Sequence, residues 1–356
     1  MEAIAREDCV AQWMEQVASA RAQGRRLLVR GADTKAFLAE QGEGEVLDVR
    51  GHQGVVDYQP SELVITVRAG TPVAQVHALL AEQGQYFPCE PPEFSGRATM
   101  GGMVASAWAG PRRPWSGGIR DYVLGCRLVS GQGKHMRFGG QVMKNVAGYD
   151  VSRLMAGSFG CLGILTEVSL KVLPQPRSRL TRALELTRRQ AADGFLRWRK
   201  AGLPLSGFCH DGERLYLRLE GGEAAVAAAA SAVGGEAADD AVWPALREQA
   251  LPFFQQPGQL WRLSLPVGTV LETLSEPSLM DWAGAQWWVK LPAGANAEHL
   301  RALARQAGGH ATCHDRTPTP GRWQMPDAGV LKLNRQLKAQ LDPHGVFDRG
   351  WLFPEP

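Results

Sequence analysis

A glycine-rich segment from Arg97 to Arg113, RATMGGMVASAWAGPRR, carries the residue types best suited to hold a ligand through backbone atoms. Paired glycines leave main-chain N–H groups open, so a diphosphate or a flat ring system can approach the chain closely. Small side chains at 105–107 permit tight packing against such a ligand. The run lacks the G-x-G-x-x-G spacing of a Rossmann fingerprint. By itself, it is more typical of a Gly-rich turn between two elements.

Two later segments supply further polar groups. The first has the pattern of a hairpin, with a strand over Tyr122–Val129, a turn at Ser130–Gly133 and a return through His135–Phe138. The second, Val142–Val172, places polar residues beside a short helix and then glycines before a strand at Ile164–Val172. These residues are Lys144, Asn145 and Asp150, followed by Gly157, Gly160 and Gly163.

The bulk composition is that of an ordinary globular chain, with 356 residues, 44% hydrophobic and 21% charged. A formal net charge of +3, without a run of Lys or Arg interleaved with aromatics, argues against a nucleic-acid partner. No stretch of about 18 apolar residues is present to span a membrane, and the first residues do not resemble a secretory signal. We therefore expect a cytoplasmic protein that reaches the inner membrane, if at all, only peripherally through partners.

Cysteine and histidine spacing predicts no metal centre. The six cysteines form no C-x-x-C pair, which excludes an iron–sulfur cluster held by this chain alone. His310 and His314 are four residues apart, which suits a metal on a helix. Their segment has the pattern of a strand, however, where such residues lie about 13 Å apart.

Alternating helices and strands are expected to position the N-terminal segments. A helix is indicated by Val10, Trp13 and Val17, and short strands by Leu27–Val29 and Leu63–Val67. The next helix begins at Thr71-Pro72, and we expect the threonine hydroxyl to cap it.

The composition changes after the Pro-rich stretch LPQPRSR at 173–179. The pattern beyond it predicts a layer of helices over an antiparallel sheet. The expected strands are Arg214–Glu220, Leu260–Leu265, Gln286–Leu291 and one near Thr312, and the expected helices are Glu223–Val233 and Ala297–Ala307. A last helix over Gly329–Leu341 carries Val330, Leu333, Leu337 and Leu341 on one face and ends at Asp342-Pro343.

Taken in order, the glycine-rich segments resemble the FAD-binding domain shared by vanillyl-alcohol oxidase, p-cresol methylhydroxylase, D-lactate dehydrogenases and glycolate oxidase. The matching patterns are a GG pair among small residues, G-x-x-R-D-Y-V-L-G, K-N-x-A-G-Y-D and G-S-x-G-x-L-G-I-x-T-E, within about Leu27 to Val172. The resemblance implies an α+β protein with a two-subdomain FAD-binding domain of the vanillyl-alcohol oxidase type over 1–174. It also implies a smaller α+β, ferredoxin-like domain over 175–320, and a C-terminal helix and tail over 321–356 that returns to the FAD domain.

The resemblance implies that FAD lies extended between the two subdomains, and that a loop after the first strand wraps its pyrophosphate. The implied cofactor-binding residues are Arg30, Gly31, Ala32, Asp33, Thr34, Lys35, Thr99, Met100, Gly101, Gly102, Ala105, Ser106, Gly110, Gly118, Asp121, Gly163 and Ile164. The catalytic residues are not identified, and the polar groups expected near the flavin face are Arg120, Lys144 and Asn145. His52 and His77 stand in no recognisable context for covalent flavin attachment, so non-covalent FAD is expected.

The pyrophosphate loop departs from the family pattern. Relatives favour Arg-Gly-Gly-Gly-Thr-Ser, and this chain has Arg-Gly-Ala-Asp-Thr-Lys at 30–35. Asp33 would repel a diphosphate unless its side chain points away, and aspartate tolerates the left-handed backbone conformation that a glycine would adopt there.

Relatives that oxidise 2-hydroxy acids unaided carry an H-G-H-G-D-G-N-x-H-like motif in the second domain, and this chain has none. We therefore expect an FAD-binding subunit of a multi-subunit enzyme that oxidises a small 2-hydroxy acid, glycolate to glyoxylate. Its partners would be a larger FAD subunit and an iron–sulfur subunit. Two alternatives stay open: a self-sufficient FAD-dependent dehydrogenase whose acid is held by Arg120 and Lys144, and a structural subunit without flavin chemistry.

Overall fold

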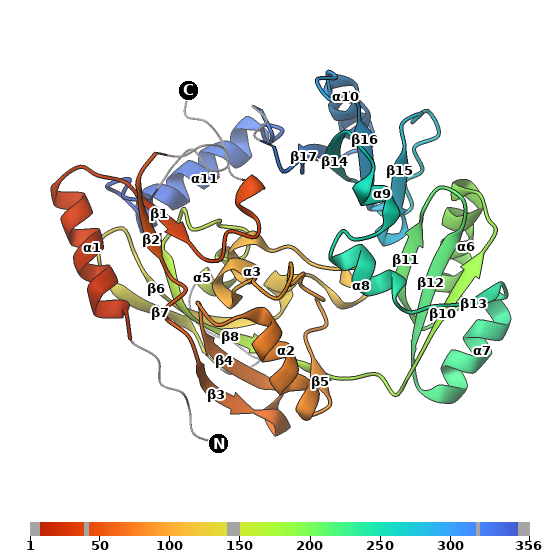
Figure 1. Ribbon diagram of the computed structural model, residues 1–356, viewed down its shortest axis with the longest axis horizontal. Helices are drawn as coiled ribbons and strands as arrows, with labels where there is room; N and C mark the ends of the chain where they lie inside the picture. Colours follow the sequence, from red (N-terminus) through yellow and green to blue (C-terminus); the bar gives the residue numbers. More distant parts are fainter. Residues whose placement is uncertain (1–7, 39–42, 141–149, 318–320, 348–356) are drawn as a thin grey trace. The chain divides into compact units, whose positions relative to one another are not determined.

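The computed structural model describes residues 8–38, 43–140, 150–317 and 321–347, and the chain divides into two compact units (Figure 1). The first unit takes its described residues from 1–108, 118–174 and 325–356, and the second from 109–117 and 175–324. The sequence-based boundaries were drawn at 174 and 320. These boundaries left residues 109–117 in the first unit, whereas the structure assigns them to the second.

An antiparallel sheet in the order β3-β4-β8-β6-β7 forms the centre of the first unit. Its strands are β3 Val55–Gln59, β4 Val64–Arg68, β6 Val123–Val129, β7 His135–Gly139 and β8 Ile164–Lys171. The three strands expected from the sequence and the β6–β7 hairpin are confirmed, and the turn closes where Ser130 N donates to Lys134 O at 3.0 Å. Helices α2 Val73–Glu82 and α3 Met100–Ser106 and a short helix α5 Val151–Leu154 belong to the same unit.

A second layer of this unit is the parallel pair β1 Leu27–Arg30 and β2 Glu45–Asp48, which packs with helix α1 Val10–Ala22. Trp13 and Val17 of α1 share this core with Phe347, near the C-terminus. Phe347 also bridges to Leu27, whose N–H donates to Val346 O at 2.7 Å. The described residues after α11 therefore belong to the same core as the first helix.

Helix α2 begins differently from the sequence-based expectation. Its N-cap is Pro72, and no side chain caps it. The Thr71 hydroxyl instead donates to Arg68 O at 2.7 Å and accepts from Gly54 N at 3.0 Å. The prediction of a threonine cap was wrong because the hydroxyl ties β4 to the preceding loop.

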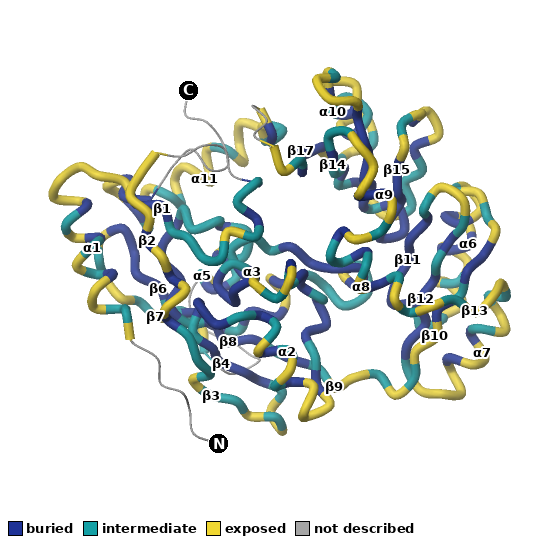
Figure 2. The backbone as a smooth tube through the Cα atoms, viewed as in Figure 1, coloured by how far each residue is buried: buried dark blue, intermediate teal, exposed yellow. Residues whose placement is uncertain are grey.

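Helix α11, Ala328–Leu341, confirms the expected C-terminal helix and its end at Asp342. No residue of α11 is buried, and Val330 and Leu333 are 49% and 66% exposed (Figure 2). The helix is held at its C-terminal end, where Lys338 Nζ donates to Phe347 O at 3.0 Å and pairs with Asp342 at 2.7 Å. The part of its apolar face at Val330 and Leu333 is therefore open among the described residues, while Leu337 and Leu341 are half-buried.

The second unit contains one antiparallel sheet of eight strands, in the order β13-β10-β12-β11-β15-β16-β14-β17. The strands are β10 Ser178–Leu184, β11 Leu205–His210, β12 Leu215–Gly221, β13 Glu236–Ala238, β14 Gln259–Ser264, β15 Ser278–Asp281, β16 Gln286–Leu291 and β17 His310–Cys313. Each half of the sheet has the order 4-1-3-2 when its strands are numbered along the chain, as in a ferredoxin-like fold. A short β11–β15 ladder joins the halves within the sheet.

Three helices cover one face of this sheet and share its apolar core: α6 Arg188–Lys200, α7 Glu223–Val233 and α10 Glu298–Gln306. Residues alternate between faces along a strand, so Leu217 and Leu263 point into this core while their neighbours Arg218 and Arg262 leave from the opposite face. Helices α8 Val242–Arg247 and α9 Pro252–Gln255 and the short helix α4 Arg113–Ser116 complete the unit. The sheet thus has one apolar face and one face rich in arginine and tryptophan.

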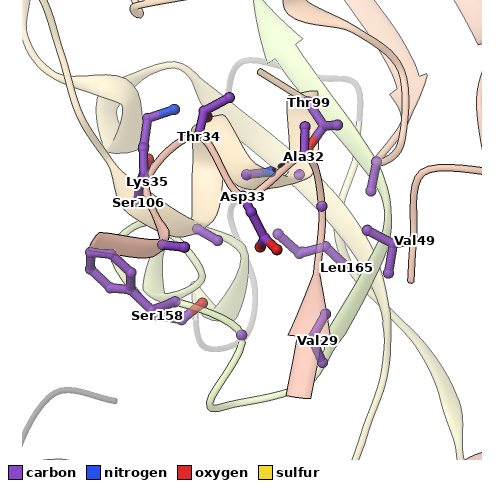
Figure 3. A pocket seen from close by; sticks show the side chains of 18 of the residues that line it. Val29, Ala32, Asp33, Thr34, Lys35, Val49, Thr99, Ser106, Ser158 and Leu165 are labelled. Atoms are coloured by element: carbon purple, nitrogen blue, oxygen red, sulfur yellow. Dashed lines mark hydrogen bonds between the residues drawn. The ribbon is translucent and has the colours of Figure 1, made fainter. Parts of the chain in front are cut away.

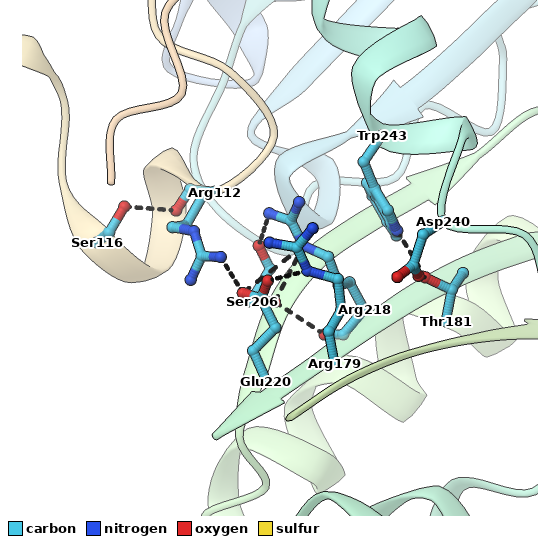
Figure 4. A network of polar contacts seen from close by, with 9 residues as sticks. All are labelled: Arg112, Ser116, Arg179, Thr181, Ser206, Arg218, Glu220, Asp240 and Trp243. Carbon is cyan, nitrogen blue, oxygen red and sulfur yellow. Dashed lines mark hydrogen bonds and ion pairs between the residues drawn. The ribbon is translucent and has the colours of Figure 1, made fainter. Parts of the chain in front are cut away.

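A buried ion network on the polar face of the sheet connects the segment 109–117 to strand β12 (Figure 4). Glu220, whose side chain is 2% exposed, pairs with Arg112, with Arg179 and, at 3.8 Å, with Arg218. Arg218 also donates to Ser206 O at 2.8 Å. Burial opposes ionisation of Glu220, but Arg218, Arg112 and a hydrogen bond from Ser206 outweigh it and lower the carboxyl pKa.

Glu220→Gln is expected to destabilise the protein by about 3–5 kcal/mol near neutral pH, because it leaves buried guanidinium groups without a counter-charge. The lowered pKa makes this stabilisation fully present above pH 4.5, the ordinary value, and lost as the pH falls through the lowered folded value. Urea unfolding of both proteins between pH 7 and pH 3 measures the difference, which should shrink with acid. Glu236→Gln, at an exposed glutamate of the same sheet, should change little.

Candidate functional site

An open cleft inside the first unit encloses about 740 Å³, including the part open to solvent (Figure 3). Its lining comes from β1 and the loop after it, from α3, from β8 and from the loop before β8. The lining residues are Val29, Gly31, Ala32, Asp33, Thr34, Lys35, Ala36, Val49, Ala69, Thr99, Gly101, Gly102, Ala105, Ser106, Ser158, Phe159, Gly160, Gly163 and Leu165.

The loop after β1 lies close to the start of α3. A Cβ on Gly31 would lie 2.7 Å from Thr99 Oγ1, so only glycine fits without a shift of its neighbour. Asp33 has a φ of 54°, the left-handed conformation expected for it, and its C=O accepts from Ala36 N at 3.1 Å. The Lys35 ammonium lies 5.1 Å from the Phe94 ring centroid. These contacts of Gly31, Asp33 and Lys35 hold the loop after β1 in a single turn conformation.

The Asp33 carboxylate is paired rather than free. Its Oδ2 accepts from Arg30 Nη1 at 3.1 Å, and the two side chains are 47% and 29% exposed. An exposed pair of this kind is worth about 0–1 kcal/mol, so the arginine can exchange this partner for another anion at small cost.

Helix α3 presents its first turn to the cleft. Thr99 is its N-cap, and Thr99 Oγ1 accepts from Gly102 N at 3.2 Å. A Cβ on Gly102 would meet only Thr99 Oγ1, at 3.0 Å. A Cβ on Gly101 would instead lie 2.8 Å from the Cβ of Ala69 and 3.1 Å from its C=O oxygen. One glycine therefore leaves space in the cleft, and the other permits α3 to touch the end of β4.

The loop before β8 completes the wall. Phe159 has a φ of 50° and donates its N–H to Ala105 O at 2.9 Å, and Gly160 has a φ of 80°. A Cβ on Gly160 would lie 3.2 Å from Val29 Cβ. These contacts bring the loop against both α3 and β1.

The structure brings many of the residues expected from sequence to this cleft. Those expected residues that line it are Gly31, Ala32, Asp33, Thr34, Lys35, Thr99, Gly101, Gly102, Ala105, Ser106 and Gly163. The lining residues that were not expected to bind the cofactor are Val29, Ala36, Val49, Ala69, Ser158, Phe159, Gly160 and Leu165. Of this second set, Ser158 and Gly160 had a sequence signal, because both are fixed positions of the pattern G-S-x-G-x-L-G-I-x-T-E.

Other expected residues lie elsewhere. Met100 and Ile164 are fully buried in the core, and the Arg30 side chain lies beside the cleft through its pair with Asp33. Asp121 Oδ2 accepts from Gly118 N at 2.8 Å and so caps a short turn.

Gly110 and the three polar candidates have separate positions. Gly110 belongs to the second unit, and its C=O accepts from Trp282 Nε1 at 3.1 Å. Arg120 is exposed. Lys144 and Asn145 lie outside the described residues.

No histidine, cysteine or tyrosine is among the described residues that line the cleft. His52 is 1% exposed and packs edge-on against Trp13 at 5.2 Å, and His77 Nδ1 lies 2.5 Å from Glu93 Oε1. Across the described parts of the chain, no helix has the length and apolarity to cross a bilayer.

Comparison with known proteins gives matches of two kinds. A family model described as an FAD binding domain matches residues 2–139. Glycolate oxidase subunit GlcE of Escherichia coli (strain K12) is 49% identical over 342 residues, which cover 96% of this chain and 97% of that protein. Glycolate oxidase subunit GlcD of Bacillus subtilis (strain 168) is 33% identical over 138 residues, 39% of this chain and 29% of that protein. The second similarity therefore covers less than half of each protein.

A solved structure of alkyldihydroxyacetonephosphate synthase superposes with a TM-score of 0.67 and 15% identity, over 94% of this chain and 73% of that one. At this identity the likeness concerns the fold. It supports an α+β architecture of the vanillyl-alcohol oxidase type for both units.

Proposed function

Because the chain belongs to the family of glycolate oxidase subunit GlcE, we propose that it is the FAD-binding subunit of a multi-subunit enzyme that oxidises glycolate to glyoxylate. The observation that carries the proposal is similarity along nearly the whole length of both proteins. The chain is an FAD-dependent oxidoreductase by its family. When bound, FAD supplies the ring that accepts a hydride from the C2 carbon of a 2-hydroxy acid.

The residues of the cleft fit FAD. Glycines at 31, 101, 102 and 160 bring backbone close to the open space, and a Cβ at Gly102 would project into that space. We propose that the turn at Gly31–Lys35 surrounds the diphosphate and that the first turn of α3 lies against the flavin end. The arginine of the Arg30–Asp33 pair then lies near the phosphate charge.

FAD is expected to be held without a covalent bond. The described lining offers no histidine, cysteine or tyrosine side chain as a tether. Acid precipitation of the yellow protein should release the flavin into the supernatant as free FAD, measured by absorbance and chromatography. Flavin that remains with the pellet would contradict this expectation.

Asp33→Gly is expected to tighten FAD binding by about fivefold, because it removes a negative charge beside the diphosphate and releases Arg30; this corresponds to about 1 kcal/mol. Glycine keeps the left-handed backbone at this position. Asp33→Asn, which loses only the charge, should act in the same direction. Fluorescence titration of the apoprotein measures both, and weaker binding in both variants would contradict the placement of the diphosphate.

We propose that the remaining parts of the reaction come from partners. Oxidation of a 2-hydroxy acid needs a base for the hydroxyl proton and a route for electrons. The sequence has neither the histidine-rich motif of unaided relatives nor a C-x-x-C pair. A larger FAD subunit, such as one related to GlcD, and an iron–sulfur subunit would supply them, and we place the assembly in the cytoplasm, peripheral to the inner membrane through those partners.

Dye reduction with glycolate tests the proposal, first with the FAD-loaded chain alone and then with the partner subunits added. Turnover should need both this chain and its partners. Robust turnover by the chain alone would favour a self-sufficient dehydrogenase. Partner activity that is indifferent to this chain, or a purified chain that ignores FAD, would favour a structural subunit.

A further inference from the structure

A left-handed turn at Trp282–Gly284 in the second unit contains three consecutive residues with positive φ. Trp282, Ala283 and Gly284 have φ values of 52°, 52° and 86° in succession. A tryptophan and an alanine rarely adopt this conformation, and such strain collects at ligand sites. Neighbours hold the turn, since Asp281 Oδ1 accepts from Trp282 N at 2.7 Å and Trp282 Nε1 donates to Gly110 O at 3.1 Å.

The turn places the Trp282 indole against two guanidinium groups. The Cζ atoms of Arg113 and Arg262 lie 4.8 Å and 5.2 Å from its ring centroid. Arg262 also lies 6.0 Å from the ring of Trp288, its cross-strand neighbour on β16. Arg262 thus has two aromatic walls on the polar face of the sheet.

Other arginines of this unit stack on tryptophan, but they also donate hydrogen bonds. Arg188 stacks on Trp287 and donates to Ser278 O, Arg218 stacks on Trp243 and donates to Ser206 O, and Arg301 stacks on Trp261 and donates to Gly321 O. Arg262 differs from them because no hydrogen bond joins its guanidinium to a described residue. Its Nε is buried without a partner, as are the Nε atoms of Arg188 and Arg301. A structural stack alone does not account for this difference, because buried donors are normally satisfied.

The charges around Arg262 do not balance its positive charge. Burial, and then repulsion by Arg113, lower the pKa of Arg262 to about 10, and Asp281 offsets this only in part. The Asp281 carboxylate already accepts two hydrogen bonds, one from Trp282 N and one from Gln286 Nε2, which lies 2.9 Å from Oδ2. His314 nearby is buried, and its lowered pKa keeps it neutral at pH 7. Two cations face one anion, which favours binding of a single negative charge.

We propose that Arg262, with Arg113 beside it and Trp282 and Trp288 as walls, binds the carboxylate of a small monocarboxylic acid. A guanidinium presents two parallel N–H groups that match the two oxygens of a carboxylate. The inference rests on the proposed function in naming the acid class, because glycolate and glyoxylate are both small monocarboxylates. It assigns to this chain a contact with the acid that the sequence did not indicate.

Isothermal titration calorimetry of glycolate into the FAD-loaded full-length chain tests the site. Saturable binding at one site is expected, and Arg262→Met should raise Kd about tenfold to a hundredfold, the effect of losing a charge-assisted hydrogen bond. Arg262→Lys should also bind more weakly, because it keeps the charge but loses the paired donors. Arg301→Met, which removes a stacked arginine from the other face of the sheet, should bind as the wild type does.

Acetate should bind at the same site, and ethylene glycol, which lacks the carboxylate, should not. Absence of saturable glycolate binding, unchanged affinity in folded Arg262→Met, or inorganic phosphate binding as tightly as glycolate would each overturn the proposal. The assay requires neither turnover nor partner subunits. A chain that binds glycolate through Arg262 in a complex that does not oxidise it would therefore refute the proposed function and leave this inference standing.

Discussion

Gly102→Val is expected to yield a folded protein that has lost its flavin. The Cβ at this position would meet only Thr99 Oγ1 within 4 Å, so the branched side chain extends into the cleft. Helix α3 tolerates the change, because valine has a higher helix propensity than glycine. We expect FAD occupancy below about a tenth of wild type; at FAD about ten times the wild-type Kd this requires a Kd raised roughly a hundredfold, a loss of about 2.7 kcal/mol of binding free energy. The ratio of flavin to protein absorbance measures it.

A substitution at the neighbouring Gly101 should affect stability rather than the space for the flavin. Gly101→Ala places a methyl group 2.8 Å from Ala69 Cβ and 3.1 Å from Ala69 O, so it should lower the unfolding temperature by separating α3 from β4. Gly222→Val, at an open glycine of the second unit, should leave the flavin content unchanged. A fully yellow Gly102→Val protein would show that the first turn of α3 does not contact the cofactor.

The expected strand Gln286–Leu291 and helix Glu223–Val233 have the observed bounds. All residues of this strand are buried, but its sequence QWWVKL contains aromatic and β-branched residues that favour a strand. Strands β11 and β15 were not predicted, and all their residues are buried. Burial on both faces removes the alternation of apolar and polar residues by which a strand is recognised.

The lining of the cleft was predicted only in part, because only some of its residues have a distinctive sequence pattern. Glycines and the polar loop at 31–35 have a sequence signature, because they permit conformations that other residues avoid. Val49, Ala69 and Leu165 line the same space from three separate segments. An apolar residue that faces a ligand has the same sequence pattern as one that faces the core, and only the fold distinguishes them.

Two features of the second unit could not be predicted from local sequence patterns. Trp282 and Ala283 adopt left-handed conformations that their residue types do not predict. The ion network of Glu220 joins Arg112 to a strand more than a hundred residues later in the chain. Neither feature repeats with a helix or strand period, so both follow from tertiary packing alone.

The exposed face of α11 leads to a second prediction of large effect. A helix of 14 residues without a buried side chain is marginal by itself, because most helical stability in proteins comes from packing of an apolar face. Leu333, at 66% exposure, is the most exposed of its aliphatic side chains. Lys332, Arg335 and Lys338 give the same helix a basic character. We propose that a partner subunit with an apolar groove and an acidic rim covers this face.

Leu333→Lys is therefore expected to prevent assembly with the partner subunits while FAD stays bound. Lysine and leucine have similar helix propensities, so α11 itself should persist. A charge placed in the centre of an apolar interface costs about 2 kcal/mol or more, at least about thirtyfold in affinity. Co-purification and glycolate-dependent dye reduction by the reconstituted complex measure the loss. Val56→Lys, at a 49% exposed aliphatic residue of β3, is the matched control and should assemble normally. Normal assembly of Leu333→Lys would show that the partner binds elsewhere on this chain.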